Sequence, residues 1–218
     1  MHQIGLGARL APRLEAIGLE CVRGERRLFR DVAFTLEPGT LLRVHGPNGS
    51  GKTSLLRILA GVLAPAAGEV RWSGERIGAL GDEYRSELAY LGHQNAIKDD
   101  LSAVENLLVS ERLAGADVSA ARAREALARL GLKGFEALPT RVLSQGQKRR
   151  ASLARLAFRA ACGLWVLDEP FVALDAAAVN EVQAIIGDQL AAGGIVVLTT
   201  HQDVAITAPT RHDLRLGS

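Results

Sequence analysis

One octapeptide constrains the fold of this chain more than any other feature of the sequence. Residues 46–53 read GPNGSGKT and match the pattern G-x-x-x-x-G-K-[ST]. They follow the apolar run TLLRVH at residues 40–45, which predicts a strand. They lead into SLLRILAGVL, where leucines recur at helical spacing. A glycine-rich loop between a strand and a helix favours an α/β fold.

The composition of this loop is typical of a phosphate-binding site. Its glycines let successive backbone N–H groups point inward, and the following helix adds its N-terminus. Lys52 would reach the β- and γ-phosphates of a nucleotide, and the Thr53 hydroxyl would ligate Mg²⁺. The alternative, a glycine-rich turn with a chance Lys-Thr pair, leaves the strand and helix on either side unexplained. The expected nucleotide-binding residues are Gly46, Pro47, Asn48, Gly49, Ser50, Gly51, Lys52 and Thr53.

An acidic pair forms the second chemical element. Asp168 and Glu169 end the apolar run LWVL, which predicts a buried strand. Ligands of open α/β sheets bind at the carboxyl ends of the strands, where this pair lies. Successive side chains point in different directions, so Asp168 can anchor Mg²⁺ while Glu169 polarises the attacking water. The alternative is a solvated acidic pair at a strand end.

The order of predicted elements indicates an α/β domain with an insertion. Between residues 101 and 160 almost nothing resembles a strand, and helices are predicted from the caps Ser102 and Ser119 and over residues 145–160. Continuous apolar strands on both sides of this stretch favour a parallel sheet covered on both faces. Strands are expected at 32–37, 40–45, 69–73, 87–91, 163–169 and 194–200, and a further helix at 175–190.

Charge and composition exclude several classes of protein. The chain has 26 basic and 24 acidic residues, a net charge of +2, which excludes a disordered polyelectrolyte and argues against a nucleic-acid-coating protein. The basic residues Lys148, Arg149, Arg150, Arg155 and Arg159 are interpreted as a solvated helix surface, since their spacing spreads them around the helix.

Cysteine and membrane signals are weak. Cys21 and Cys162 show neither a disulfide framework nor zinc spacing, and Cys162 is expected to be a buried, inert thiol in a reducing cytoplasm. The longest charge-free run, residues 189–202, falls short of the ~20 apolar residues that a bilayer requires. The N-terminus shows no signal peptide, so membrane association would depend on a partner.

Four further motifs carry a resemblance to a known family. The segment LSQGQ at residues 143–147 resembles the L-S-G-G-Q signature of ABC-type ATPases, with Gln145 replacing the first glycine. Gln94 lies where that family has its Q-loop glutamine, and Ala173-Leu174-Asp175 follows the acidic pair as the family's D-loop does. His201 closes a predicted strand, where the switch histidine belongs.

The resemblance implies a fold and a division of the chain. The implied fold is a P-loop NTPase domain with a mostly parallel sheet, an antiparallel β subdomain and an inserted helical lobe. Residues 1–13 would be a loose N-terminal tail and residues 14–218 one ABC ATPase domain. The RecA-like core would span about 14–98 and 161–218, with the helical lobe at about 99–160.

The resemblance also implies a shared active site with ATP and Mg²⁺. Two copies would form an ATP-dependent homodimer, packed head to tail, with each ATP between the loop of one copy and the signature of the other. The implied trans residues are Ser144, Gln145, Gly146, Gln147 and Asp175; for Ser144 a plain helix cap is the alternative. The implied catalytic residues are Glu169, His201, Lys52 and Gln94, and the implied Mg²⁺ residues are Thr53, Gln94 and Asp168.

One departure concerns the nucleobase. Members of the family place an aromatic residue before the loop, where it stacks on adenine. Here Arg23 takes that position, with Phe29 further along the chain. A guanidinium plane can stack on a base, so Arg23 is an expected ATP-binding residue, but the basis of adenine selectivity is weakened.

Local sequence narrows the resemblance further. LGHQNAIK at residues 91–98, the signature context LSQGQKRRASLARL, and GGIVVLTTHQ resemble the ATPase subunit of the bacterial cytochrome c maturation (haem exporter) system. This implies separate transmembrane permease subunits, an indirect link to a haem chaperone, no nucleic acid, and a peripheral position on the cytoplasmic face of the bacterial inner membrane. Residues 94–102 would dock on the permease. The alternatives are an ABC ATPase for another substrate (lipid, metal or drug) and a soluble ABC-type ATPase.

Overall fold

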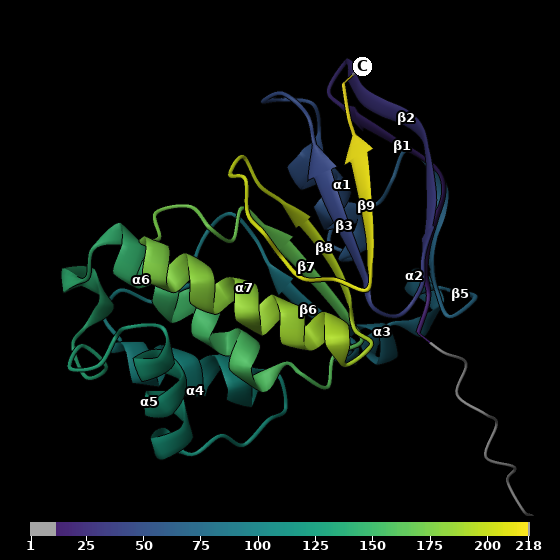
Figure 1. Ribbon diagram of the computed structural model, residues 1–218. Coiled ribbons are helices and arrows are strands. Elements are labelled where there is room, and N and C mark those ends of the chain that lie inside the picture. Colours follow the sequence, from purple (N-terminus) through teal and green to yellow (C-terminus); the bar gives the residue numbers. More distant parts are fainter. Residues whose placement is uncertain (1–11, 218) are drawn as a thin grey trace, which may run out of the picture.

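The computed structural model describes residues 12–217, which fold into two β-sheets and a group of helices (Figure 1). The larger sheet has the strand order β6-β7-β8-β3-β9, and its neighbouring strands pair in parallel. Its strands are β3 (Thr40–His45), β6 (Leu88–Leu91), β7 (Leu164–Asp168), β8 (Ile195–Thr199) and β9 (Thr210–Arg215).

The smaller sheet is antiparallel and has the order β2-β1-β4-β5. Its strands are β1 (Leu14–Arg23), β2 (Arg26–Leu36), β4 (Ala67–Trp72) and β5 (Glu75–Arg76). The expected fold class, a mostly parallel sheet with an antiparallel β subdomain and a helical insertion, is confirmed. The short helices α2 (Ile77–Leu80) and α3 (Asp82–Ser86) lead back to the larger sheet.

The parallel sheet separates two hydrophobic cores. Every residue of β7 and β8 is buried, as expected for strands covered on both faces. Trp165 and Leu167 face one core together with helix α7 (Ala176–Ala191) and the helical insertion. Val166 and Val197 face the other core, which contains helix α1 (Lys52–Leu59) and the antiparallel sheet.

The helical insertion follows β6 and precedes β7 in the chain, and in space it lies away from the antiparallel sheet (Figure 1). It contains α4 (Ala103–Leu113), α5 (Ala120–Arg129), the 3₁₀ helix η1 (Thr140–Val142), α6 (Gln145–Leu153) and the 3₁₀ helix η2 (Ala154–Phe158). Ser102 caps α4 in a capping box with Glu105, and Ser119 caps α5 by accepting from the Arg122 N–H.

The helix expected at residues 145–160 is shorter than predicted. Helix α6 ends at Leu153 and continues as the 3₁₀ helix η2. In a continued α-helix the Ser152 carbonyl would accept from the N–H of residue 156. Here that carbonyl accepts from Arg155 Nε at 3.1 Å, at the point where the chain changes to the tighter 3₁₀ helix.

Sequence periodicity also missed parts of the sheets. It predicted a strand at residues 32–37, whereas β1 and β2 form a long hairpin over residues 14–36, and it did not predict the edge strand β9. The tail expected at residues 1–13 lies, apart from Pro12 and Arg13, outside the described residues. Within residues 12–217, no helix combines the length and apolar character needed to cross a membrane.

Candidate functional site

The glycine-rich loop joins β3 to α1, and close packing explains its glycines. A Cβ on Gly46 would lie 2.5 Å from the Leu216 carbonyl oxygen, and one on Gly51 would lie 2.9 Å from the Phe29 ring. Both glycines have positive φ angles, 145° and 97°, which disfavour side chains. The backbone at Leu216 thus packs directly against the loop. A residue with a side chain would clash at Gly46 and at Gly51.

The loop presents positive charge and N–H groups at the start of α1. Gly51 is the N-cap residue and supplies no side-chain acceptor to the first turn. The Lys52 ammonium donates hydrogen bonds to the Gly46 and Pro47 carbonyl oxygens at 2.7 and 3.2 Å, so it is folded back over the loop. A cation above uncapped helix N–H groups favours an anion such as phosphate.

A hydroxyl relay holds the acidic pair at the end of β7. Thr53 Oγ1 donates to Asp168 Oδ2 at 2.9 Å, and Thr199 Oγ1 donates to Asp168 Oδ1 at 2.7 Å. The same Thr199 hydroxyl accepts from the Glu169 N–H at 2.9 Å. Thr199 therefore fixes both acidic residues. Sequence analysis missed it, although a polar residue ending an apolar strand beside β7 was a usable signal.

The oxygens of Thr53 and Asp168 suit Mg²⁺. They are hard oxygen ligands held next to each other, although the two residues are far apart in sequence. The described residues contain no group of three or more His, Cys, Asp or Glu side chains arranged to hold a metal. A magnesium ion would therefore complete its coordination with phosphate oxygens and water, as is usual for nucleotide-bound Mg²⁺.

Glu169 has the features of a reactive carboxylate. Its φ of 49° lies in the left-handed region, a strained backbone for a residue with a side chain. It is 9% exposed, and its buried Oε1 makes no hydrogen bond within the described residues. His201 Nε2 lies 3.4 Å from Oε1, and the His201 side chain is exposed. Apart from this contact with His201, Oε1 has no hydrogen-bond partner among the described residues, and it can accept a proton from water.

These residues surround one cleft of about 670 Å³. The sequence-predicted residues on its wall are Arg23, Asn48, Gly49, Gly51, Lys52, Thr53, Asp168, Glu169 and His201. Gly46, Pro47 and Ser50 belong to the loop but do not line the cleft. Gln94 is exposed and does not line it either, whereas its neighbour His93 does.

The end of the cleft beyond the loop is lined by arginines. Arg23, Arg26 and Leu28 form this wall, and sequence analysis missed Arg26. Phe29 is buried, 7% exposed, and packs against Gly51, so it serves the core instead of a base. No Phe, Tyr or Trp of the described chain lines the cleft. The guanidinium planes of Arg23 and Arg26 could stack on a base.

The signature segment lies outside this cleft, at the start of α6. Ser144 is the N-cap and forms a capping box with Gln147, so the capping role is real. Ser144 and Gln145 are exposed, and a Cβ on Gly146 would lie 2.5 Å from the Ala173 carbonyl oxygen. Asp175 caps α7 by accepting from the Ala178 N–H. The signature helix and the loop after β7 are thus in direct contact.

The interpretation of the basic residues of α6 and η2 as a solvated surface is wrong. Arg149 is 4% exposed, and the side chains of Lys148 and Arg150 are only 15% and 18% exposed. Arg159 pairs with the fully buried Glu111 at 2.9 Å. These cations turn inward because carbonyl oxygens and carboxylates of other segments supply their partners, which spacing along one helix does not show.

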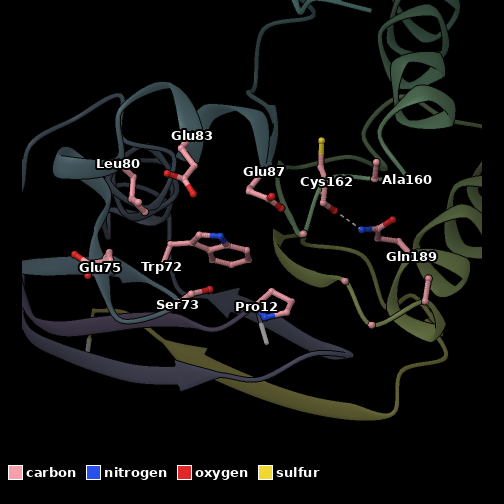
Figure 2. A pocket seen from close by; sticks show the side chains of 15 residues that line it. Pro12, Trp72, Ser73, Glu75, Leu80, Glu83, Glu87, Ala160, Cys162 and Gln189 are labelled. Carbon is pink, nitrogen blue, oxygen red and sulfur yellow. Dashed lines mark hydrogen bonds between the residues drawn. The ribbon is translucent and has the colours of Figure 1, made fainter. Parts of the chain in front are cut away.

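A second cavity lies at the other end of the parallel strands, beside Gly163 and Gly194, which precede β7 and β8 (Figure 2). Its volume is about 430 Å³, and Trp72, Glu83 and Gln189 are on its wall. Cys162 also lines it, is 7% exposed as expected of a buried thiol, and has its pKa raised by burial. No sequence-predicted site residue lies there, so the phosphate chemistry belongs to the first cleft.

Comparison with known proteins gives consistent matches. The ABC transporter family model matches residues 29–172. The cytochrome c biogenesis ATP-binding export protein CcmA of Nitrosospira multiformis is 52% identical over 207 residues, covering 94% of this chain and 99% of that protein. The protein of the same name from Dechloromonas aromatica is 55% identical over 204 residues, covering 94% of this chain and all of that protein.

Solved structures agree in fold. An ABC transporter ATP-binding protein from Pyrococcus furiosus is 27% identical and superposes with a TM-score of 0.78, covering 93% of this chain and 97% of that one. The dimeric ABC transporter cassette MJ0796 is 23% identical with a TM-score of 0.78, covering 93% of this chain and 94% of that one. At that identity the second likeness concerns the fold alone.

Proposed function

This chain belongs to the ABC transporter family of ATP-binding proteins, and on that premise we propose that it powers a membrane complex of cytochrome c maturation. It is an ABC-type ATPase, which converts ATP and water to ADP and phosphate. The more specific role is supported by the likeness to cytochrome c biogenesis relatives. Two of them are more than 50% identical to this chain, and the alignments cover almost all of their length. The proposed task is the release or export of haem to a periplasmic haem chaperone.

The proposed chemistry assigns each side of the cleft a role. The loop N–H groups and Lys52 bind the phosphates. Thr53 and Asp168 would hold Mg²⁺, and a bound Mg²⁺ would supply positive charge beside the phosphates. Glu169 Oε1, which is free of other hydrogen bonds, accepts a proton from the attacking water and orients it toward the γ-phosphate.

His201 and Gln94 complete the proposed set from different positions. His201, which is exposed at the cleft wall, hydrogen-bonds the γ-phosphate and registers that ATP is intact. Gln94 is exposed and lies off the wall, so its proposed contact with Mg²⁺ requires its side chain to turn toward the phosphates. His93 faces the cleft without such a movement.

We propose that a second copy completes the site. Ser144 and Gln145 are exposed and lie outside their own chain's cleft. In a head-to-tail dimer the N-terminus of α6 would meet the partner copy's γ-phosphate, where helix N–H groups stabilise negative charge. Gly146, Gln147 and Asp175 would form the rest of this trans surface. ATP would then hold the two copies together.

The proposed docking surface for the permease is residues 94–102. This segment has a defined shape, since the Asn106 side chain hydrogen-bonds the Lys98 N–H at 2.7 Å and the Lys98 carbonyl at 2.9 Å. Ile97 packs against the core of the helical lobe, so Ile97→Asp would also affect folding. Lys98→Glu is the cleaner test because the side chain is exposed. It should weaken membrane attachment without changing ATP affinity.

The experiment that tests the role is the recovery of partners. Tagged Glu169→Gln is isolated from gently solubilised membranes with ATP and Mg²⁺, partners are identified by mass spectrometry, and haem is read by absorbance. Recovery of cytochrome c maturation membrane proteins supports the proposal and a peripheral position on the cytoplasmic face of the inner membrane. An unrelated permease would keep the ATPase mechanism and reject the haem role. Ribosomes or nucleic acid alone would reject the transport role.

A further inference from the structure

Arg149 reaches from the signature helix to the backbone of the acidic pair. One of its terminal nitrogens, Nη2, donates to the Asp168 carbonyl at 2.7 Å and to the Glu169 carbonyl at 2.9 Å. The other, Nη1, lies 3.3 Å from both the Gly92 carbonyl and Asn95 Oδ1. A single guanidinium therefore joins helix α6, the end of β7 and the segment that contains Gln94.

The surroundings of Arg149 offset the cost of burying its charge. The residue is 4% exposed, and burial lowers its pKa while the charge of Asp168 opposes that shift. A buried guanidinium is costly unless acceptors and negative charge surround it. Two of its acceptors are main-chain oxygens of the acidic residues, so Arg149 holds this segment without occupying either carboxylate.

Helix α6 holds the Gln94 segment at a second point. Ser152, which is 2% exposed, donates from Oγ to the Asn95 carbonyl at 2.8 Å. Arg149 thus contacts the side chain of Asn95, and Ser152 holds its carbonyl, from neighbouring positions on one face of helix α6. The contacts on Gly92 and Asn95 bracket His93 and Gln94, which are exposed at or beside the cleft.

We propose that Arg149 is a positioning residue for ATP hydrolysis. It sets where the Glu169 carboxylate lies by holding the carbonyl of the same residue, whose positive φ is a strained conformation that its surroundings must maintain. The inference rests on the proposed role of Glu169 as the water-activating carboxylate. It adds a residue that touches neither ATP nor water and acts through the backbone.

The test separates turnover from binding. In the full-length protein, isolated with its membrane partners, Arg149→Met should lower kcat about 10- to 100-fold, since displacements of about 1 Å have that effect. The dissociation constant for a fluorescent ATP analogue should change by less than about twofold, because the loop and Lys52 are untouched. Guanidinium ion, added far below denaturing concentrations, should restore part of the turnover of Arg149→Ala.

Two further variants make the result interpretable. Arg149→Lys keeps the charge but cannot bond four acceptors, so its kcat should lie between those of the wild type and Arg149→Met. Lys148→Gln removes a positive charge from the neighbouring position, whose partner is Asp99, and should keep kcat. Glu169→Gln is measured alongside. If Glu169→Gln keeps turnover, the proposed catalytic carboxylate is wrong, whatever Arg149 does.

The positioning role is rejected by either of two results. If Arg149→Met keeps kcat while Glu169→Gln loses it, the junction does not serve hydrolysis. If Arg149→Met and Arg149→Lys lose ATP affinity and thermal stability in parallel with turnover, and guanidinium restores nothing, Arg149 is only a folding residue. A selective loss of kcat with recovery by guanidinium supports the proposal.

Discussion

At the residue scale, the hydroxyl of Thr199 organises the acidic pair as closely as the motif residues do. It accepts from the Glu169 N–H and donates to Asp168 Oδ1, with β8 fully buried around it. Because both bonds use one oxygen, loss of the hydroxyl leaves a buried N–H without a partner and frees one carboxylate oxygen. A buried unsatisfied group costs about 1–3 kcal/mol.

Thr199→Val should therefore lower both stability and turnover. The isosteric side chain keeps the packing of β8, so the loss reports the hydroxyl. Thermal unfolding and steady-state ATP hydrolysis are the measurements. Thr200→Val is the matched control, since the Thr200 hydroxyl accepts from the Gln202 N–H, away from the acidic pair. Wild-type turnover in Thr199→Val would show that the Thr199 relay has no effect on hydrolysis.

The arginine wall of the cleft predicts weak selection among purines. Arg23, Arg26 and Leu28 offer stacking and donors but no acceptor for the adenine amino group. Sites without matched hydrogen bonds discriminate by about 10- to 200-fold at most. We expect the kcat/KM values for ATP and GTP to differ by no more than about 200-fold. A ratio several orders of magnitude larger would mean that another group reads the base.

At the element scale, the contact between α6 and the loop after β7 ties the signature to the site. A Cβ on Gly146 would lie 2.5 Å from the Ala173 carbonyl oxygen, and that backbone atom cannot move as a side-chain end can. Gln145 is exposed beside it, which explains how the chain accepts a side chain where the family pattern has glycine.

Gly146→Ala should displace the start of α6 and lower ATP turnover, with less effect on ATP affinity, because the cleft lies elsewhere. Gln145→Ala changes the neighbouring exposed residue, and its thermal unfolding should match that of the wild type. Hydrolysis rates and nucleotide titrations give the comparison. A Gly146→Ala variant with wild-type turnover would show that this contact can relax at no cost to function.

Helix α4 contains two glutamates whose pKa values move in opposite directions. Burial raises the pKa of Glu111, with Arg159 opposing the shift, while hydrogen bonds from Ser102 lower the pKa of Glu105. A raised carboxyl pKa means that the folded state binds more protons, so this group's contribution to stability falls as pH rises above its ordinary value near 4.5. A lowered pKa, as for Glu105, means that the group's contribution to stability rises as pH rises.

Glu111→Gln should therefore gain stability relative to the wild type as pH rises from acidic to neutral. Glu105→Gln should lose relative stability over the same range, since the favourable charge of Glu105 is present only above its pKa. Unfolding temperatures measured from about pH 4 to pH 7 provide the test. Parallel changes in both variants would contradict the assigned directions.

At the scale of the whole molecule, the sequence predicted the parts of the site that are local. The loop at residues 46–53 and the pair Asp168-Glu169 are short segments next to their own strands, so pattern and context suffice. Four of the five parallel strands, β3, β6, β7 and β8, were predicted to within two residues because each is mostly apolar, whereas the polar edge strand β9 (TRHDLR) was missed.

The missed features depend on segments that meet only in the folded chain. Arg149 looks like a surface cation along α6, because its acceptors belong to β7 and to residues 92–95. Arg26 reaches the cleft through the β1–β2 hairpin, whose length the periodicity did not show. His93 and Gln94 are neighbours, and which of them lines the cleft is set by the bend after β6, not by residue type.

ATP is expected to be hydrolysed in a site that a second copy of this chain completes. The most direct measurement is the molar mass in solution of purified Glu169→Gln with ATP and Mg²⁺, with ADP, and with Lys52→Ala added to the same chain. With ATP and Mg²⁺ the expected mass is near twice the 23.2 kDa of one chain. With ADP, or with Lys52→Ala added, the expected mass is that of one chain. A single-chain mass with ATP bound would contradict the shared site.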